Sequence, residues 1–163
     1  MTEPRASRPH MPGYGILPRD EGKGLLPWSW AEAFIAGARN YPITTTRPDG
    51  APHTMPVWGV WLDGRLWFST SATSTKARNL ARDPRVAVPL VHERDEEAVV
   101  IEGVAEPMPA DADRAAFIAA YKAKYDWDMT DEPGPLWSVR PTRVFAFSAG
   151  GDFAGTATRW VFE

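Results

Sequence analysis

Short runs of apolar, β-branched and aromatic residues separated by tight turns dominate the middle of the chain. Three such runs lie at Tyr41–Thr46, Ala51–Leu62 and Arg65–Thr70. Gly50 and Gly64 stand between them, where a hairpin needs a residue that tolerates a positive φ. Because β-branched and aromatic side chains fit a pleated surface, this pattern predicts three consecutive antiparallel strands.

The same pattern predicts three more strands further along the chain. They are expected at Arg85–His92, Ala98–Glu106 and Arg143–Ser148. Six short strands, with turns about every 8–12 residues, are typical of an antiparallel barrel or sandwich. The run at 51–62 carries apolar residues on both faces, so one face fills a barrel and the other needs a partner surface. We therefore expect a mainly β protein with helices, built as a six-stranded antiparallel barrel that forms a homodimer.

Three segments carry helical signals. Ser29–Glu32 has the form of a capping box, which predicts a helix to about Ala38. A short basic helix is expected to end at Arg82, and a further helix is expected to follow Asp111. The residues expected to face the core are Trp30, Ala33, Phe34 and Gly37 in the first helix, and Phe117, Ile118, Tyr121 and Tyr125 in the last.

The two ends of the chain differ in character. Residues 1–24 are rich in proline, glycine and charge, and we expect them to form a flexible arm, mobile or draped over the rest. Residues 25–163 are expected to form a single domain, long enough to bury a core of its own.

The start of the short basic helix is the candidate site for chemistry. Four hydroxyl residues precede or open it: Ser71, Thr73, Ser74 and Thr75. Lys76 adds a positive charge in the first turn, and Asn79 shares its face. Unpaired N–H groups and the helix dipole attract anions at such a position, which suits a ligand phosphate. The alternative is an ordinary capped surface helix, with Arg78 and Arg82 as surface charge or dimer contacts.

Composition narrows the possible functions. A net charge of −3 gives no general attraction to nucleic acid. The chain has no cysteine and only three scattered histidines, so we expect neither disulfides nor a metal site. No apolar run approaches a membrane span and no signal peptide is recognisable, which predicts a soluble cytoplasmic protein without a membrane partner.

The block from Tyr41 to Arg85 resembles a known superfamily. The segments that carry the likeness are Thr-Thr-Arg-Pro-Asp-Gly-Ala-Pro-His-Thr-Met-Pro-Val-Trp (45–58), Leu-Trp-Phe-Ser-Thr (66–70) and Ser-Thr-Lys-Ala-Arg-Asn-Leu-Ala-Arg-Asp-Pro-Arg-Val (74–86). They resemble the FMN-binding split-barrel superfamily, which includes the pyridoxamine 5′-phosphate oxidases and the flavin/deazaflavin oxidoreductases. The likeness is greatest to the branch that uses coenzyme F420.

The resemblance implies a split β-barrel homodimer with a flavin-type cofactor in a cleft between subunits. In the oxidase branch, the end of the third strand and the helix start hold the FMN phosphate, and the matching residues here are Ser69, Thr70, Ser74 and Lys76. That branch also uses an arginine on the second strand, where this chain has Met55. Losing a guanidinium removes charge-assisted hydrogen bonds to the phosphate, so the departure argues against FMN.

In the deazaflavin branch, the resemblance assigns Lys76 and Asn79 to the phosphate and polar tail of the cofactor. Backbone groups near Val57 and Trp58 would then lie against the polar edge of the ring. The expected function is hydride transfer from reduced coenzyme F420 to an unsaturated small-molecule substrate. The alternatives are an FMN-dependent oxidase or reductase, and a protein that binds a flavin, deazaflavin or tetrapyrrole without turning it over. No residue is assigned a catalytic role.

Overall fold

The computed structural model describes residues 3–92, 96–108, 114–129, 134–148 and 152–163. The chain divides into two compact units, the first made of Met1–Ala38, Val88–Glu102 and Pro141–Glu163, and the second of Arg39–Ala87 and Gly103–Arg140. Strands β6 (Arg85–His92), β7 (Glu97–Pro107) and β8 (Leu136–Ser148) contribute residues to both. Asp111, after which the last helix is expected to begin, lies outside the described residues. The prediction of a single domain at 25–163 stays a prediction.

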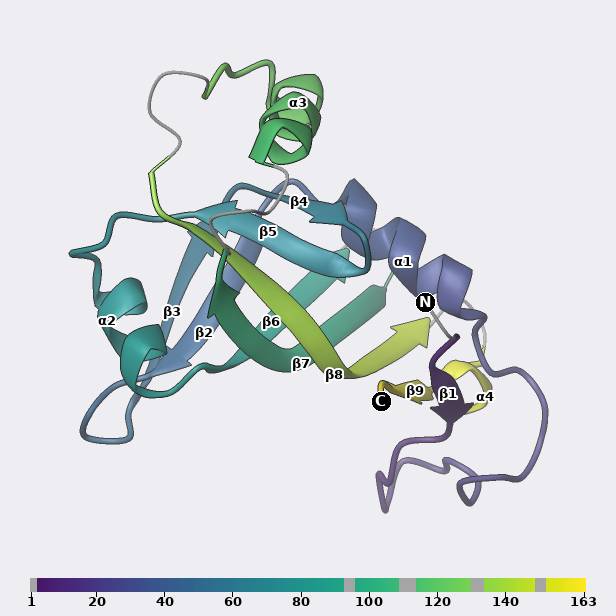
Figure 1. Cartoon of the computed structure of the whole chain (residues 1–163). Helices are drawn as coiled ribbons and strands as arrows, with labels where there is room; N and C mark the ends of the chain where they lie inside the picture. Colours follow the sequence, from purple (N-terminus) through teal and green to yellow (C-terminus); the bar gives the residue numbers. More distant parts are fainter. Residues whose placement is uncertain (1–2, 93–95, 109–113, 130–133, 149–151) are drawn as a thin grey trace. The chain divides into compact units, whose positions relative to one another are not determined.

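The second unit is built from two hairpins and two helices (Figure 1). Strand β2 (Tyr41–Thr46) pairs antiparallel with β3 (Pro52–Val57), and β4 (Gly59–Leu62) pairs with β5 (Arg65–Ser69). Strand β5 also pairs with the first part of β8. Helix α2 (Thr75–Arg82) contacts β2, and α3 (Arg114–Tyr125) contacts β4.

The predicted second strand, 51–62, is two strands broken at Trp58, and this part of the prediction is wrong. The break coincides with contacts that Gly59 makes to a distant residue, Tyr125. Both the N–H and the carbonyl of Gly59 bond the hydroxyl of Tyr125, at 2.9 and 2.8 Å. A Cβ at this position would lie 2.8 Å from the carbonyl oxygen of Trp67. The backbone therefore leaves the β2–β3 hairpin at Trp58 and begins a new one with β5.

Helix α3 covers a small apolar core in this unit. Phe117, Tyr121 and Tyr125 are buried with Val60 and Leu136, as the predicted stripe requires. Ile118 is partly buried against the same cluster.

In the first unit, the buried face of the first helix differs from the predicted one. Helix α1 (Trp28–Gly37) begins one residue before Ser29, with Pro27 at the N-cap and no side-chain cap, so the predicted capping box is wrong. The buried residues are Ala31 and Ile35. The bond from the N–H of Leu26 to Thr158 Oγ1 (2.8 Å) ties the chain down just before the helix starts. Of the residues expected to face the core, Trp30 and Phe34 are half-buried and stack on each other, whereas Ala33 and Gly37 are exposed.

The same unit contains elements that the sequence pattern did not predict. Strand β1 (Arg5–Ser7) pairs with β9 (Thr158–Val161), which pairs with β8, and α4 (Phe153–Thr156) precedes β9. Strand β8 begins at Leu136, seven residues before the predicted start. The described residues thus form nine strands instead of six, whereas the mainly antiparallel β class with helices is confirmed. Part of the predicted N-terminal arm is a paired strand, and the mobility of residues 1–24 stays a prediction.

Two properties of the described residues concern membrane spans and metal sites. None of the helices there combines the length and the apolar character needed to cross a membrane. In the same residues, no group of three or more His, Asp or Glu is placed to hold a metal ion.

Candidate functional site

The N-terminus of α2 is capped as the sequence predicts. Ser74 stands at the N-cap in an extended conformation, and its Oγ accepts a hydrogen bond from the N–H of Ala77 at 3.1 Å. Just before it, Ser71 Oγ and Thr73 Oγ1 lie 3.0 Å apart. These local bonds explain why the hydroxyl-rich stretch ends the loop and starts the helix here.

Lys76 is buried beside these hydroxyls. Its side chain is only 6% exposed, and its Nζ donates to Thr70 Oγ1 at 3.4 Å. Thr70 Oγ1 in turn lies 3.1 Å from Ser74 Oγ. Burial lowers the pKa of Lys76, because removal from water disfavours the charged ammonium. The structure thus brings together three of the predicted site residues: Thr70, Ser74 and Lys76.

This arrangement leaves a buried cation without a compensating charge. Among the described residues, no carboxylate lies within 4.0 Å of Lys76 Nζ, and its hydrogen-bond partner is a neutral hydroxyl. A buried charge is costly unless it is paired. The positive end of the α2 dipole adds to the field. An anion placed against Lys76 would therefore be held by charge-assisted bonds that the protein does not satisfy internally.

Asn79 has a structural partner. It is 3% exposed, and its Nδ2 donates to Thr45 Oγ1 at 2.9 Å. This bond fixes α2 against β2, whatever other contact the amide makes. The predicted cofactor role of Asn79 stays a prediction.

Ser69 and Thr70 form the end of β5 next to a tight segment of chain. The N–H of Thr70 donates to the carbonyl of Pro135 at 3.2 Å. A Cβ on Gly134, whose φ is +63°, would lie 2.9 Å from Ser69 Oγ. This close approach restricts the space around Ser69, one of the predicted phosphate contacts.

Val57 and Trp58 lie further along the β2–β3 hairpin. In the β2–β3 register Thr45, the partner of Asn79, faces His53, four residues before Val57. At about 3.4 Å per residue, the end of β3 at Val57 therefore lies roughly 14 Å along the strand from the position next to Asn79. Trp58 is 42% exposed and stacks on Tyr125, with ring centroids 4.6 Å apart and planes at 2°. The predicted residues thus form an anion corner and a separate aromatic edge, not one contact cluster.

Sequence reasoning missed a cationic hollow beside the anion corner. A cavity of about 470 Å³ lies between α2 and the β2–β3 turn, and it is lined by Arg47, Pro48, Asp49, Thr75, Arg78, Asn79 and Arg82. Arg82 donates to the carbonyl of Thr46 and Arg78 donates to Thr75 Oγ1, so both arginines are held near the opening. The sequence pattern does not indicate Arg47 as a site residue, because only the folded hairpin brings the β2–β3 turn, which carries Arg47, next to α2.

Lys124 lies beside the aromatic edge. Its Nζ donates to the hydroxyl of Tyr41 at 2.8 Å and lies over the rings of Tyr41 and Tyr125. Burial, with repulsion from Arg39 second, lowers the pKa of Lys124 from 10.5 to about 8. This amine therefore loses its proton far more readily than an exposed lysine does.

This shift predicts a pH dependence of stability. Between pH 8 and 10.5 the unfolded chain keeps a proton on Lys124 that the folded chain releases, so the free energy of unfolding contributed by this group rises with pH. We expect wild type to gain stability relative to Lys124→Met between about pH 7 and about pH 9.5 in urea unfolding. Lys122→Met is the control, because Asp128 raises the pKa of Lys122 and its proton stays bound through this range. A wild-type to Lys124→Met difference that is constant with pH would contradict the prediction.

The chain resembles known proteins both in sequence and in structure. The profile of the family described as "Pyridoxamine 5'-phosphate oxidase" matches residues 30–147. A pyridoxine/pyridoxamine 5′-phosphate oxidase of Bacteroides fragilis is 30% identical over 121 residues, which is 73% of this chain and 48% of that protein. The chain thus spans about half the length of the curated relatives that it matches.

Solved structures with a similar fold have names that indicate different roles. A structure named F420 reductase is 26% identical, with a TM-score of 0.57, over 69% of this chain and 94% of the other. A heme binding protein from Mycobacterium smegmatis is 27% identical, with a TM-score of 0.61, over 74% of this chain and 52% of the other. The relatives therefore share a barrel whose named ligands differ from one protein to the next.

Proposed function

The chain belongs to the pyridoxamine 5′-phosphate oxidase family, and we propose that it is an oxidoreductase that holds an anionic flavin-type cofactor at the start of α2. The cofactor proposed is coenzyme F420, and the substrate an unsaturated small molecule. The split-barrel superfamily expected from the sequence is thereby confirmed.

The observation that carries this proposal is the buried ammonium of Lys76, which has only a hydroxyl partner within the described residues. A phosphate would supply the missing negative charge, and Thr70, Ser74 and the first turn of α2 offer further donors. The residues present therefore fit the phosphate-bearing end of a cofactor.

The choice of F420 over FMN rests on Met55. Met55 is 51% exposed on β3 and offers no positive charge where the oxidase branch uses an arginine. The likeness to the F420 reductase, at 26% identity and covering 94% of that chain, supports the same choice.

The residues of this chain would bind and orient, and the cofactor would carry the redox chemistry. A bound reduced deazaflavin supplies the hydride. Lys76 would neutralise the charged tail of the cofactor. Trp58 and the backbone at Val57 would offer a flat edge for the ring, roughly 14 Å along β3 from the position of His53. A rigid position for both ends reduces the entropic cost of bringing donor and acceptor together.

Titration of the purified protein with each ligand tests the proposal. We expect saturable binding of coenzyme F420, measured by fluorescence, with weaker binding of FMN. A second measurement, turnover of reduced F420 with a panel of enones and other conjugated acceptors, tests the oxidoreductase assignment. Micromolar binding of FMN without binding of F420 would defeat the proposed cofactor.

The likeness to a heme binding protein makes a non-catalytic tetrapyrrole binder the second candidate. The same titrations, with haem as the third ligand, separate the two functions. Tight haem binding that displaces F420, without turnover of any acceptor, would favour the second candidate.

The proposal includes a homodimer with β3 at the subunit interface. Strand β3 ends the sheet order and pairs, within the part of the chain described, only with β2. Its residues are mostly exposed, and Pro52 and Pro56 limit ladder hydrogen bonds at this edge. Exposed Met55 and Trp58 offer an apolar surface for a second copy.

Met55→Glu should therefore weaken self-association. A carboxylate without a partner in an apolar interface is costly, and we expect dimer affinity to fall by roughly tenfold or more. Sedimentation velocity over a concentration series measures the effect. Val91→Glu, which changes another exposed apolar strand residue, is the matched control. An unchanged dimer in Met55→Glu would remove β3 from the interface.

A further inference from the structure

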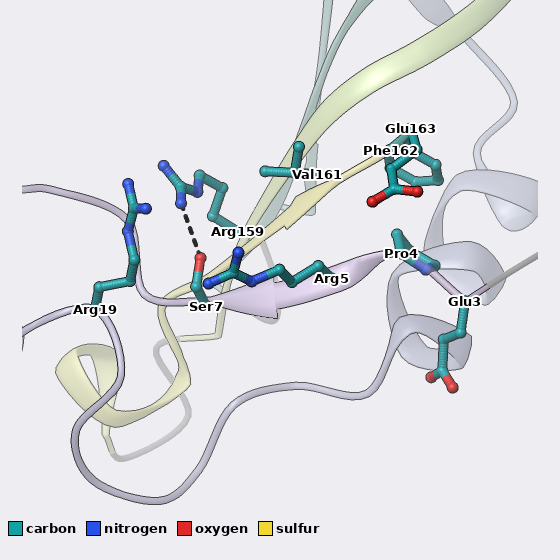
Figure 2. Close-up of a pocket in the computed structure, with 9 residues that line it drawn as sticks. All are labelled: Glu3, Pro4, Arg5, Ser7, Arg19, Arg159, Val161, Phe162 and Glu163. Atoms are coloured by element: carbon teal, nitrogen blue, oxygen red, sulfur yellow. Dashed lines mark hydrogen bonds between the residues drawn. The ribbon is translucent and has the colours of Figure 1, made fainter.

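A cavity of about 530 Å³ opens in the first unit beside the β1–β9 ladder. In this ladder Ser7 faces Arg159 and Arg5 faces Val161. Side chains two residues apart share a face of a strand, so all four belong to one side of the ladder. Figure 2 shows the guanidinium groups of Arg5 and Arg159 beside Ser7, with Arg19 rising next to them from the neighbouring loop.

Arg8 holds the loop that carries Arg19. It is 1% exposed, and its backbone N–H donates to the carbonyl of Arg19 at 3.1 Å. Its guanidinium donates to the carbonyls of Glu21 (2.9 Å), Lys23 (2.6 Å) and Gly155 (2.8 Å). Arg19 is therefore fixed at the cavity by a buried anchor one residue beyond β1.

Within the described residues, the arginines at the cavity form no ion pair with a carboxylate. Among the described residues, no carboxylate lies within 4.0 Å of the guanidinium groups of Arg5, Arg19 or Arg159. Arg143, which is also close to Arg159, is engaged by Glu102 at 3.3 Å. Positive charge therefore gathers at the arginine end of the pocket, in a chain whose net charge is −3.

Arg159 is the most constrained of the three. Its Nη2 donates to Ser7 Oγ at 3.0 Å, whereas its Nε is buried and has no hydrogen-bond partner within the described residues. Burial lowers the pKa of Arg159, and repulsion from Arg19, Arg143 and Arg5 lowers it further, whereas attraction to Asp20 opposes the shift in part. A bound anion would relieve this repulsion.

We propose that this pocket binds a small organic phosphate ester, with the phosphate among Arg5, Arg19 and Arg159 and the organic group against Val161 and Phe162. Guanidinium forks match the geometry of phosphate oxygens, and the Ser7 hydroxyl adds a further polar group. The volume is that of a small-molecule site and exceeds what an inorganic ion needs.

The other end of the pocket restricts the ligand. Glu3 and Glu163 line it, and Figure 2 shows their carboxylates apart from the arginine cluster. These carboxylates repel a second anionic group, so the ligand carries its charge at one end. The site lies within the first unit and is independent of Lys76 and of the proposed cofactor.

Calorimetric titration of the full chain with phenyl phosphate tests the proposal. We expect saturable binding that is tighter than binding of inorganic phosphate, because the phenyl ring can contact Phe162. Arg159→Gln should weaken phenyl phosphate roughly tenfold, as expected for a lost charge-assisted contact. Since Arg159 also bonds Ser7 across the ladder, Arg19→Gln is the second variant, which leaves the β1–β9 pairing intact.

Two controls separate this pocket from the rest of the chain. Arg85→Gln removes the same charge from a side chain that is 81% exposed, and Lys76→Met removes the cation at α2; neither should change binding of phenyl phosphate. The absence of saturable binding would overturn the proposal, as would unchanged affinity in both arginine variants. Loss of binding in Lys76→Met would also overturn it, because the phosphate would then lie at α2.

Discussion

Tyr125→Ala is expected to destabilise the protein by about 3–5 kcal/mol, the range for truncation of a large buried aromatic side chain. Tyr125 is 7% exposed, ends α3 and lies in the core that this helix covers. Its ring stacks on Trp58 and contacts Tyr121 at 4.8 Å between centroids. Truncation would therefore open a cavity and remove the support for Trp58 in one step.

The hydroxyl of Tyr125 has a separate role. It accepts from the N–H of Gly59 at 2.9 Å, and its single proton is shared between the carbonyls of Gly59 and Arg39, both 2.8 Å away. Tyr125→Phe leaves the packing but removes these bonds, and a buried N–H without a partner costs about 1–3 kcal/mol. Urea unfolding of both variants measures the two contributions.

Tyr121→Phe is the matched control, because Tyr121 lies in the same cluster and no bond of its hydroxyl fixes the backbone of Gly59. We expect Tyr121→Phe to cost less than Tyr125→Phe. Equal effects of the two substitutions would show that the Tyr125 hydroxyl does not hold the break between β3 and β4.

The same break shows what local sequence pattern could not predict. Residues 51–62 alternate like one strand, and the break beside Gly59 depends on the Tyr125 hydroxyl, 66 residues further along the chain than Gly59. The ladder of β1 with β9 joins still more distant segments, with Arg5 opposite Val161. Neither segment is long enough to show a period of its own.

The sequence correctly predicts features that depend only on residues close together in the chain. Ser74 caps α2, and the stripe at Phe117, Tyr121 and Tyr125 is buried, because both depend on spacing within one helix. The face of α1 was predicted wrongly, because the chain enters that helix from Pro27 and a tertiary bond at Leu26 precedes it.

The candidate site likewise has one part that the sequence predicts and another that depends on tertiary structure. Thr70, Ser74 and Lys76 lie within seven residues, so a linear motif could place them together, and the structure does so. Arg47 and the arginine pocket at Arg159 required tertiary structure, since their partners come from separate hairpins and from the N-terminal segment. The linear sequence pattern therefore located the anion corner, but neither the role of Arg47 nor the separate arginine pocket.

Lys76→Met is expected to weaken binding of coenzyme F420 by roughly 1–3 kcal/mol, the range for a lost charge-assisted contact. The apoprotein should melt at the same temperature or higher. Methionine fills a similar volume, and the substitution removes a buried charge that, among the described residues, has only the Thr70 hydroxyl as partner. Fluorescence titration and thermal melting of the same preparations measure both effects.

The combination of weaker binding with undiminished stability is what distinguishes a ligand site from a structural lysine. A lysine that served only the fold would lose melting temperature on substitution and leave affinity unchanged. Lys122→Met, at an exposed lysine paired with Asp128, makes the same chemical change and should alter neither quantity appreciably. If Lys76→Met bound F420 as tightly as wild type, the cofactor's charged tail would have to lie away from α2, and the buried ammonium would need another explanation.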